Sequence, residues 1–256
     1  MNLRILSACY VTIFICIVMV QGAFAQTVVP GVSSGDFFVY NIKCFWSSSD
    51  PNATCPPFLI EINETEWFRV NIVSVGDTYV IYQHTFRFKN GTEYQSGDCR
   101  TCLDSGTTTG EYYPFFLIIA ANLSSKDKVY PAASNSPIIN ETIIREYGSY
   151  RRETNHVIGN VTTGDIEHDL LNLFFDIYFD RPTGVCVESY WKADRVIYDT
   201  EGSYLIYQSE IYQSTIVDSN VWIVPEFPSF LILLAFMIAT LQAAVIYKKL
   251  RLTITF

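Results

Sequence analysis

The residues best suited to acid–base or metal chemistry are His84, His156 and His168, which lie far apart in the chain. None belongs to an H-E-x-x-H pattern, and the sequence has neither a G-x-S-x-G motif nor a glycine-rich phosphate loop. His84 falls on the apolar side of an alternating run, so we expect it in the core. His156 is expected on a strand, where it could face outward.

An acidic stretch, GDIEHD, contains Asp165, Glu167 and Asp169, whose oxygens are the ligand type that calcium prefers. The spacing lacks the fuller D-x-D-x-D-G pattern, so acidic residues at the start of a short helix are the simpler interpretation. These carboxylates and His156 are the only candidates for a secreted hydrolase or metal enzyme. No group of residues in the sequence forms a recognisable catalytic or metal-binding pattern. We therefore predict a non-enzymatic protein without a cofactor or a bound metal.

Seven cysteines occur, two of them within the first 25 residues. The others are Cys44, Cys55, Cys99, Cys102 and Cys186. In an exported domain disulfides persist, and we prefer the pairs Cys44–Cys55 and Cys99–Cys102, although four cysteines allow three connectivities. A four-cysteine zinc site is disfavoured because ten residues separate the members of the first pair. Cys186, within GVCVESYW, is expected to be a small buried apolar residue.

Asn-x-Ser/Thr sequons are more frequent than the roughly two that chance would give. They occur at Asn52, Asn63, Asn90, Asn122, Asn140 and Asn160. This excess predicts an N-glycosylated domain outside the cell, with most of its loops exposed to solvent.

The first 25 residues contain a single charged side chain, Arg4, then an apolar stretch and Ala23-Phe24-Ala25. This order is typical of a secretory signal peptide that is cleaved before Gln26. An uncleaved membrane anchor is the alternative.

A second apolar segment carries no charge from Phe230 to Tyr247, and a helix of that length spans roughly 27 Å, close to the hydrocarbon thickness. Lys248, Lys249 and Arg251 follow it, so the positive-inside rule places the C-terminus in the cytoplasm and the ectodomain at the cell surface. The expected order is a signal peptide (1–25), an extracellular β domain (26–217), a stalk (218–229), a transmembrane helix (230–247) and a basic cytoplasmic tail (248–256). The membrane is therefore the first expected partner.

Alternation with period two dominates the middle of the chain, as in residues 78–88, where Asn90-Gly91 follows as a hairpin turn. Further strands are expected over 36–45, 67–75, 136–147, 150–158, 173–179, 185–196 and 204–216. Short helices are expected over 58–65 and 166–173, the second capped by Asp165. The fold class is all-β: a single antiparallel, hairpin-connected domain, either a broad curved sheet with one packed side or a β-sandwich.

The net charge of −9 and the pI of about 4.8 argue against nucleic acid as a partner, because phosphate binding needs basic clusters. Tyr, Phe and Trp occupy both faces of several strands. We therefore keep two non-enzymatic hypotheses: a surface protein with a structural or interaction role, and a module that holds a lipid or other apolar ligand on a concave β face.

The C-terminal segment resembles the PEF-CTERM sorting signal of archaeal surface proteins. Pro225-Glu226-Phe227-Pro228 precedes the apolar helix, and the basic residues follow it, so all three parts of that signal appear in order. The resemblance implies that an archaeosortase recognises the motif, cuts near it and transfers the protein to a surface anchor. The apolar helix would then be only a temporary anchor.

Other stretches resemble an uncharacterised group of archaeal exported proteins that carry this tail. They are NETEWFRVNIVSV, KNGTE, AANLSSKDKVYP, INETI, RETNH and FDRPTGVCVE. The strand-rich layout and the D-x-x-T-G hairpin are also similar to curved half-barrel domains of the lipoprotein-carrier type. That similarity is an analogy of fold and implies no activity.

Overall fold

The computed structural model describes residues 28–110, 115, 117–147, 150–165, 169–198 and 204–221. The chain divides into two compact units, Met1–Ser219 and Asn220–Phe256, and every element below belongs to the first. The expected signal peptide, PEFP motif, transmembrane helix and basic tail lie outside the described residues. Within the described ranges, no helix is long and apolar enough to cross a membrane.

The described part of the chain folds into strands and one short helix. These elements are β1 (Phe37–Ser48), α2 (Pro57–Asn63), β2 (Thr65–Val75), β3 (Tyr79–Phe88), β4 (Glu93–Gln95), β5 (Cys99–Cys102), β6 (Thr108–Thr109), β7 (Glu141–Tyr147), β8 (Tyr150–Asp165), β9 (Asp169–Asp180), β10 (Cys186–Tyr198) and β11 (Tyr204–Ser219).

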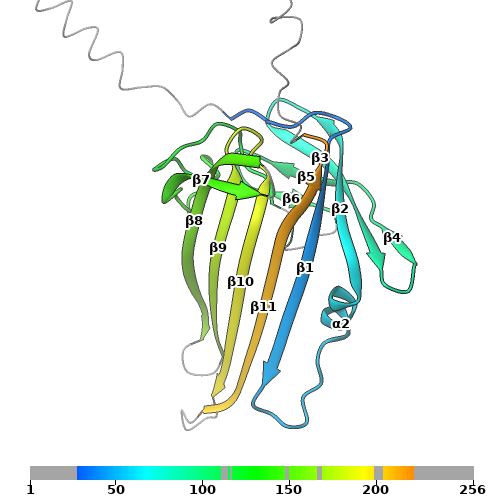
Figure 1. The fold of residues 1–256 in the computed structure, drawn as a ribbon. Coiled ribbons are helices and arrows are strands. Elements are labelled where there is room, and N and C mark those ends of the chain that lie inside the picture. The colour runs from blue at the N-terminus through cyan, green and yellow to red at the C-terminus, as the bar shows by residue number, and fades with distance from the viewer. Residues whose placement is uncertain are drawn as a thin grey trace, which may run out of the picture. The chain divides into compact units, whose positions relative to one another are not determined.

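All the strands belong to one 11-stranded sheet, in the order β6-β5-β3-β2-β1-β11-β10-β9-β8-β7, with β4 paired to β3 (Figure 1). Every pairing is antiparallel, and the end strands β6 and β7 are not paired with each other, so the sheet is open. The predicted all-β antiparallel class is confirmed. The described residues form one sheet rather than the two packed sheets of a sandwich.

Two short helices were expected, and one is present. α2 matches the expectation for 58–65 and buries Leu59 and Ile62. The expectation of a helix over 166–173 is wrong, because β9 begins at Asp169 and pairs with β8 and β10 on its two sides. Apolar residues recur at every second position from Leu171 to Phe179, and this period suits a strand better than a helix.

One face of the sheet, here called the inner face, carries the core. Large side chains of β1, β2 and β3 lie on it, and Tyr40, Phe68 and His84 are at most 1% exposed. The irregular segment 117–139 and Phe115 contribute further buried side chains: Phe115, Ile118, Ile119, Leu123, Val129 and Ile139. Phe115 packs edge-on against Phe68, with ring centroids 6.0 Å apart. The opposite side of the sheet is called the outer face.

The segment 117–139 is attached to the sheet near the turn between β9 and β10. An isolated bridge joins Ile118 to Val185, and the Asn122 amide donates to the Arg181 carbonyl. This attachment holds the core cover at one end of the long strands. Toward the other end of β8–β11, the inner face of the sheet extends beyond the segment 117–139.

Candidate functional site

Burial along the inner face decreases in successive rows across strands β1, β11, β10, β9 and β8. The row that pairs Ile42, Ser214, Ser189, Ile177 and Val157 is fully buried. Further along the strands, every second residue again faces the inner side, and the pairing registers align these residues in three more rows. Most of these residues are only half-buried, so the packed core ends within the sheet and not at its edge.

The first half-buried rows are rich in aromatic groups. Tyr212 pairs with Trp191, which pairs with Phe175, and in the next row Trp46 pairs with Glu210. The Trp191 and Phe175 rings are 5.5 Å apart, and Tyr212 contacts Phe115 at 6.1 Å. We call these five residues, Trp46, Phe175, Trp191, Glu210 and Tyr212, the aromatic inner surface.

Gly159 makes room for one of these rings. A Cβ atom at this position of β8 would lie 2.7 Å from Cζ of Phe175, closer than real Cβ contacts. The bare backbone of Gly159 therefore lets the Phe175 ring lie over β8. Leu173 and Leu171, further along β9, continue the apolar surface on the same face and are half-buried.

Glu210 is the one carboxylate within the aromatic inner surface. Its Oε2 accepts a hydrogen bond of 2.6 Å from the Tyr212 hydroxyl, and among the described residues no Lys or Arg forms a salt bridge with it. The pKa of the Tyr212 phenol is raised well above its usual range. Burial is the main cause, and the hydrogen bond to Glu210 and the charge of Glu210 add to it. A carboxylate surrounded by aromatic rings can orient a polar or cationic end of a ligand.

Trp191 supplies a second polar group. Its Nε1 is buried and has no hydrogen-bond partner in the described structure. An indole N–H can only donate, and leaving it without an acceptor costs about 1–3 kcal/mol.

The outer face has a separate charged cluster around His156. Its Nδ1 lies 3.1 Å from a Glu141 oxygen, its Nε2 lies 2.8 Å from an Asp176 oxygen, and its ring stacks on Tyr178 at 4.4 Å. Arg145 of β7 also lies over the Tyr178 ring at 3.9 Å. Both imidazole nitrogens are occupied by carboxylates, so neither is available to a metal or a substrate.

Of the candidates for a hydrolase, the structure describes the side chains of His156 and Asp169, and these two are not brought together. His156 pairs with Tyr178 on the outer face, whereas Asp169 lies on the inner face at the other end of β9 and forms two hydrogen bonds with Arg195. Nine residues of strand separate Asp169 from Tyr178, which is roughly 30 Å. Glu167 and His168 lie outside the described residues. In the described ranges, no group of three His, Cys, Asp or Glu side chains has metal-binding geometry.

The expected disulfides are corrected by the structure: no disulfide is present among the described residues. Cys99 and Cys102 are three residues apart on extended β5, so their Cα atoms are about 10 Å apart and their side chains face opposite sides. Cys44 directs its thiol to the Leu59 carbonyl at 3.0 Å. Burial, with the neighbouring Cys55 and Glu210, raises the pKa of the Cys44 thiol to about 11.

Two expectations of core residues are confirmed. His84 is 1% exposed and lies between the rings of Phe68 and Tyr82, at centroid distances of 5.3 and 5.1 Å. Cys186 is completely buried, and this burial raises the pKa of its thiol. Neither residue is accessible to a ligand.

All six sequon asparagines are exposed. Three of them form hydrogen bonds through their side chains. The Asn63 side chain bonds the Cys44 backbone, Asn90 Oδ1 accepts from the Thr92 amide, and Asn140 Oδ1 accepts from the Ile158 amide. Exposure is compatible with glycosylation, which stays a prediction. The sorting-motif residues and the basic tail lie outside the described residues.

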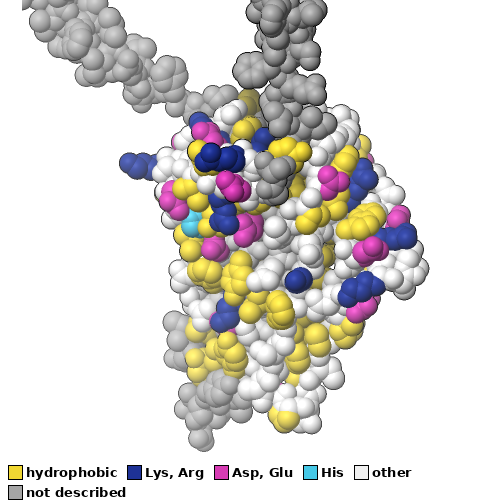
Figure 2. All heavy atoms as spheres, viewed as in Figure 1, with side chains coloured by type: hydrophobic (Ala, Val, Ile, Leu, Met, Phe, Trp, Pro, Cys, Tyr) yellow, Lys and Arg dark blue, Asp and Glu magenta, His cyan; other side chains and the backbone are white. Residues whose placement is uncertain are grey.

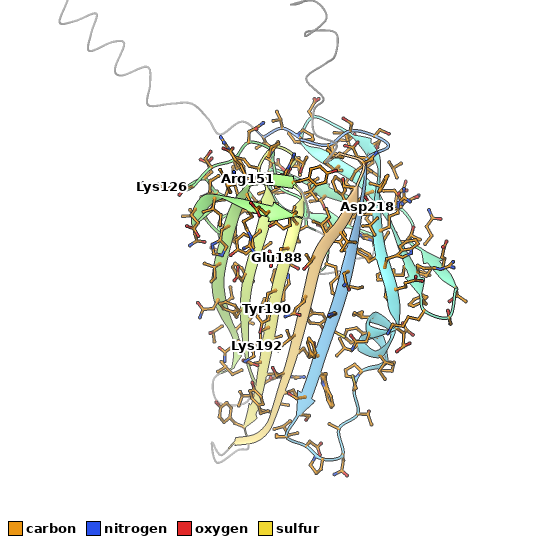
Figure 3. All side chains as sticks on the ribbon, viewed as in Figure 1. Lys126, Arg151, Glu188, Tyr190, Lys192 and Asp218 are labelled. Carbon is orange, nitrogen blue, oxygen red and sulfur yellow. The ribbon has the colours of Figure 1, made fainter. Side chains whose placement is uncertain are left out.

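The outer face differs in character along its length. In Figure 2 charged side chains gather near the end where β7 lies, and apolar side chains are spread over the remainder of the long strands. Figure 3 shows Glu188, Tyr190 and Lys192 in order along β10 on this face. Phe45 and Phe174 remain 55% and 36% exposed.

No protein-family model and no curated protein matches this chain. The aromatic inner surface was not singled out from the sequence, although alternation in CVESYWKAD places Trp191 on the same face as Ser189. The missing information was the pairing of strands, which brings Trp46, Trp191 and Tyr212 together from three separate segments.

Proposed function

We propose that this protein is a non-enzymatic surface module that holds a lipid or other apolar ligand against the inner face of its sheet. The observation that carries this proposal is the aromatic inner surface, where the rings of Trp46, Trp191 and Tyr212 remain half-buried. A fully packed domain would cover such rings, because burying an aromatic side chain contributes about 1.5–3 kcal/mol. A bound apolar molecule would complete that burial.

The fold supports this proposal. One open antiparallel sheet, with its core cover attached at one end, is compatible with a curved half-barrel of the lipoprotein-carrier type. In such a shape the uncovered part of the inner face would be the concave ligand surface. Glu210 would be the polar group that orients the ligand.

The test is a titration of the purified full chain in nanodiscs with the fluorescent fatty acid cis-parinaric acid, with the signal of matched empty nanodiscs subtracted because the probe also enters their lipid. Leu173→Lys places a charge on the inner face beside the aromatic inner surface, and we expect binding to weaken at least about tenfold, a cost of 1.4 kcal/mol. Leu170→Lys is the matched control, because it lies on the outer face of the same strand. Equal binding by both variants and the unchanged chain would refute the proposal.

Export and anchoring are the second part of the proposed role. The signal-peptide pattern, the sequons and the PEFP segment motivate a glycosylated protein that is anchored at the cell surface and processed by an archaeosortase. Intact-mass measurement of protein from the native membrane tests this. A mature chain that keeps Arg251 and carries no lipid adduct would rule out processing at Pro225–Pro228.

A further inference from the structure

The outer edge of β8 is only partly paired. β7 pairs with Tyr150–His156, whereas β9 pairs with Thr154–Asp165 on the other side of β8. No described strand lies beside β8 after His156 on the side of β7. In Figure 1 this stretch of β8 forms the margin of the sheet beyond β7.

The backbone groups that face this edge can be assigned. The Asn140 amide donates to the His156 carbonyl, and the Ile158 amide donates to the Asn140 side chain. His156 and Ile158 therefore direct their backbone groups away from β9. Because a strand repeats every two residues, Asn160 and Thr162 direct theirs to the same side.

This edge has no charge, proline or bulge of the kind that usually prevents strand addition, and the sequon residue Asn160 within it directs its side chain to the outer face and not toward a pairing strand. The run Ile158–Thr163 reads IGNVTT, without a charge or a proline, and the β8–β9 register has no bulge. Natural sheets commonly protect exposed edges with such features. Ile158 is 40% exposed on the outer face and Val161 is 51% exposed on the inner face, so a pairing strand would cover apolar surface on both sides.

We propose that this edge pairs with the same edge of a second copy, as two antiparallel β8 strands related by a two-fold axis at Val161. In this register Asn160 and Thr162 of the two copies form hydrogen-bonded pairs, and Val161 faces its own equivalent in a non-hydrogen-bonded pair. Gly159 of one copy lies opposite Thr163 of the other, and the missing side chain of the glycine leaves room for the threonine.

Charge favours a second copy at this run over other contacts between copies. The chain carries a net charge of −9, which opposes close contact between most of its surfaces. The run Ile158–Thr163 is neutral, and the two-fold register opposes no like charges. The sheet would then continue from one copy into the other.

The register can be tested by cross-linking. In a non-hydrogen-bonded pair the two Cα atoms lie about 4.5 Å apart, which is within disulfide range. Val161→Cys in the full chain, produced without glycans in non-ionic detergent, should therefore give a cross-linked dimer under mild oxidation. Thr163→Cys is the matched control: it lies on the same face, but its two copies would be roughly 13 Å apart.

A second variant separates pairing from folding. Val161→Lys puts like charges opposite each other at an exposed position, so the circular dichroism spectrum should stay unchanged while sedimentation velocity shows loss of the dimer. Equal cross-linking of Val161→Cys and Thr163→Cys, above the level of the unaltered chain, would mean random collision and overturn the proposal. A monomeric unaltered chain would also overturn it.

Discussion

Asp180 organises the turn between β9 and β10 from a completely buried position. Its two oxygens accept from the Arg152 guanidinium at 2.7 and 2.8 Å, and Oδ2 also accepts from the Thr183 amide and hydroxyl. Gly184 follows with a φ of +73°, and the Ile119 carbonyl approaches it so closely that a side chain would clash. The D-x-x-T-G pattern is thus explained by the architecture of this turn.

Asp180→Ala should lower the free energy of unfolding by about 3–5 kcal/mol, because it leaves the Arg152 guanidinium without its buried partner. Urea denaturation of the purified chain measures this. Glu153→Ala is the control: it removes an exposed partner of Arg181 and should cost at most about 1 kcal/mol. Similar losses for the two variants would contradict this role for Asp180.

Asp194 on the outer face offers a pH-dependent test. Partial burial raises its pKa, but hydrogen bonds from Lys192, Ser209 and Tyr207 outweigh burial and lower the pKa below its usual value. A lowered pKa in the folded state means that this carboxylate stabilises the fold above the pKa of the unfolded chain. That contribution is lost as the pH falls through the folded pKa.

Asp194→Asn should therefore destabilise the protein by about 1–2 kcal/mol at neutral pH. The difference from the unaltered chain should shrink once the pH falls below about 4, the usual value for Asp. Denaturation midpoints measured from pH 7 down to acid conditions test this. A difference that stays constant with pH would exclude the charge of Asp194 as its cause.

At the scale of elements, α2 fills a gap between two neighbouring strands. β1 pairs with β2 only from Phe37 to Tyr40, although both strands continue further. Beyond that point the Asn63 side chain accepts from the Cys44 amide at 3.0 Å and donates to the Cys44 carbonyl at 2.9 Å. One side chain at the end of α2 thus replaces a strand partner of β1.

Asn63→Ala should cost about 1–3 kcal/mol of stability, because it leaves two backbone groups of Cys44 without partners. Asn52→Ala removes another exposed sequon asparagine, in a turn, and should change stability by less than about 0.5 kcal/mol. Thermal unfolding of both variants in protein made without glycans gives the comparison. An equal effect of both would mean that Asn63 does not support β1.

At the scale of the whole β domain, the first and last strands are neighbours. β1 pairs with β11 from Phe38–Ser219 to Ser48–Gln208, and this pairing joins the two halves of the sheet. Contacts so distant in the sequence slow folding, because the entropy of closing a long loop is lost before they form. We expect cooperative unfolding to depend on the last strand.

A chain that ends at Ser219 should retain cooperative unfolding, because the first compact unit ends there. A chain that ends at Glu210 should lose it, since Ser214 and Ile216 would be missing from the buried inner face. Far-UV circular dichroism during heating distinguishes the two. Cooperative unfolding of the shorter chain would show that β1 does not need this part of β11.

Much of the secondary structure was predictable because alternation of apolar and polar residues directly indicates a half-buried strand. The runs around Val80–Phe88 and Val185–Val196 are of this kind, as is the core position of His84. The helix expected over 166–173 failed because acidic residues after Gly164 suggested a helix start, whereas pairing with β8 and β10 stabilises a strand. The disulfide expectation failed because spacing in sequence does not reveal that Cys99 and Cys102 lie on one extended strand.

The sequence by itself determined the all-β class, the burial of His84 and Cys186, and the exposure of the sequon asparagines, because these depend on local periodicity and side-chain chemistry. Only the tertiary structure decided the order of the strands and the distribution of burial along them. Trp46, Trp191 and Tyr212 share a surface because three distant strands pair in one register. The β8 edge is exposed because β7 ends its pairing at His156. The first depends on hydrogen bonds between segments far apart in the chain, and the second on where the pairing of one hairpin stops, and neither is encoded by the alternation of apolar and polar residues.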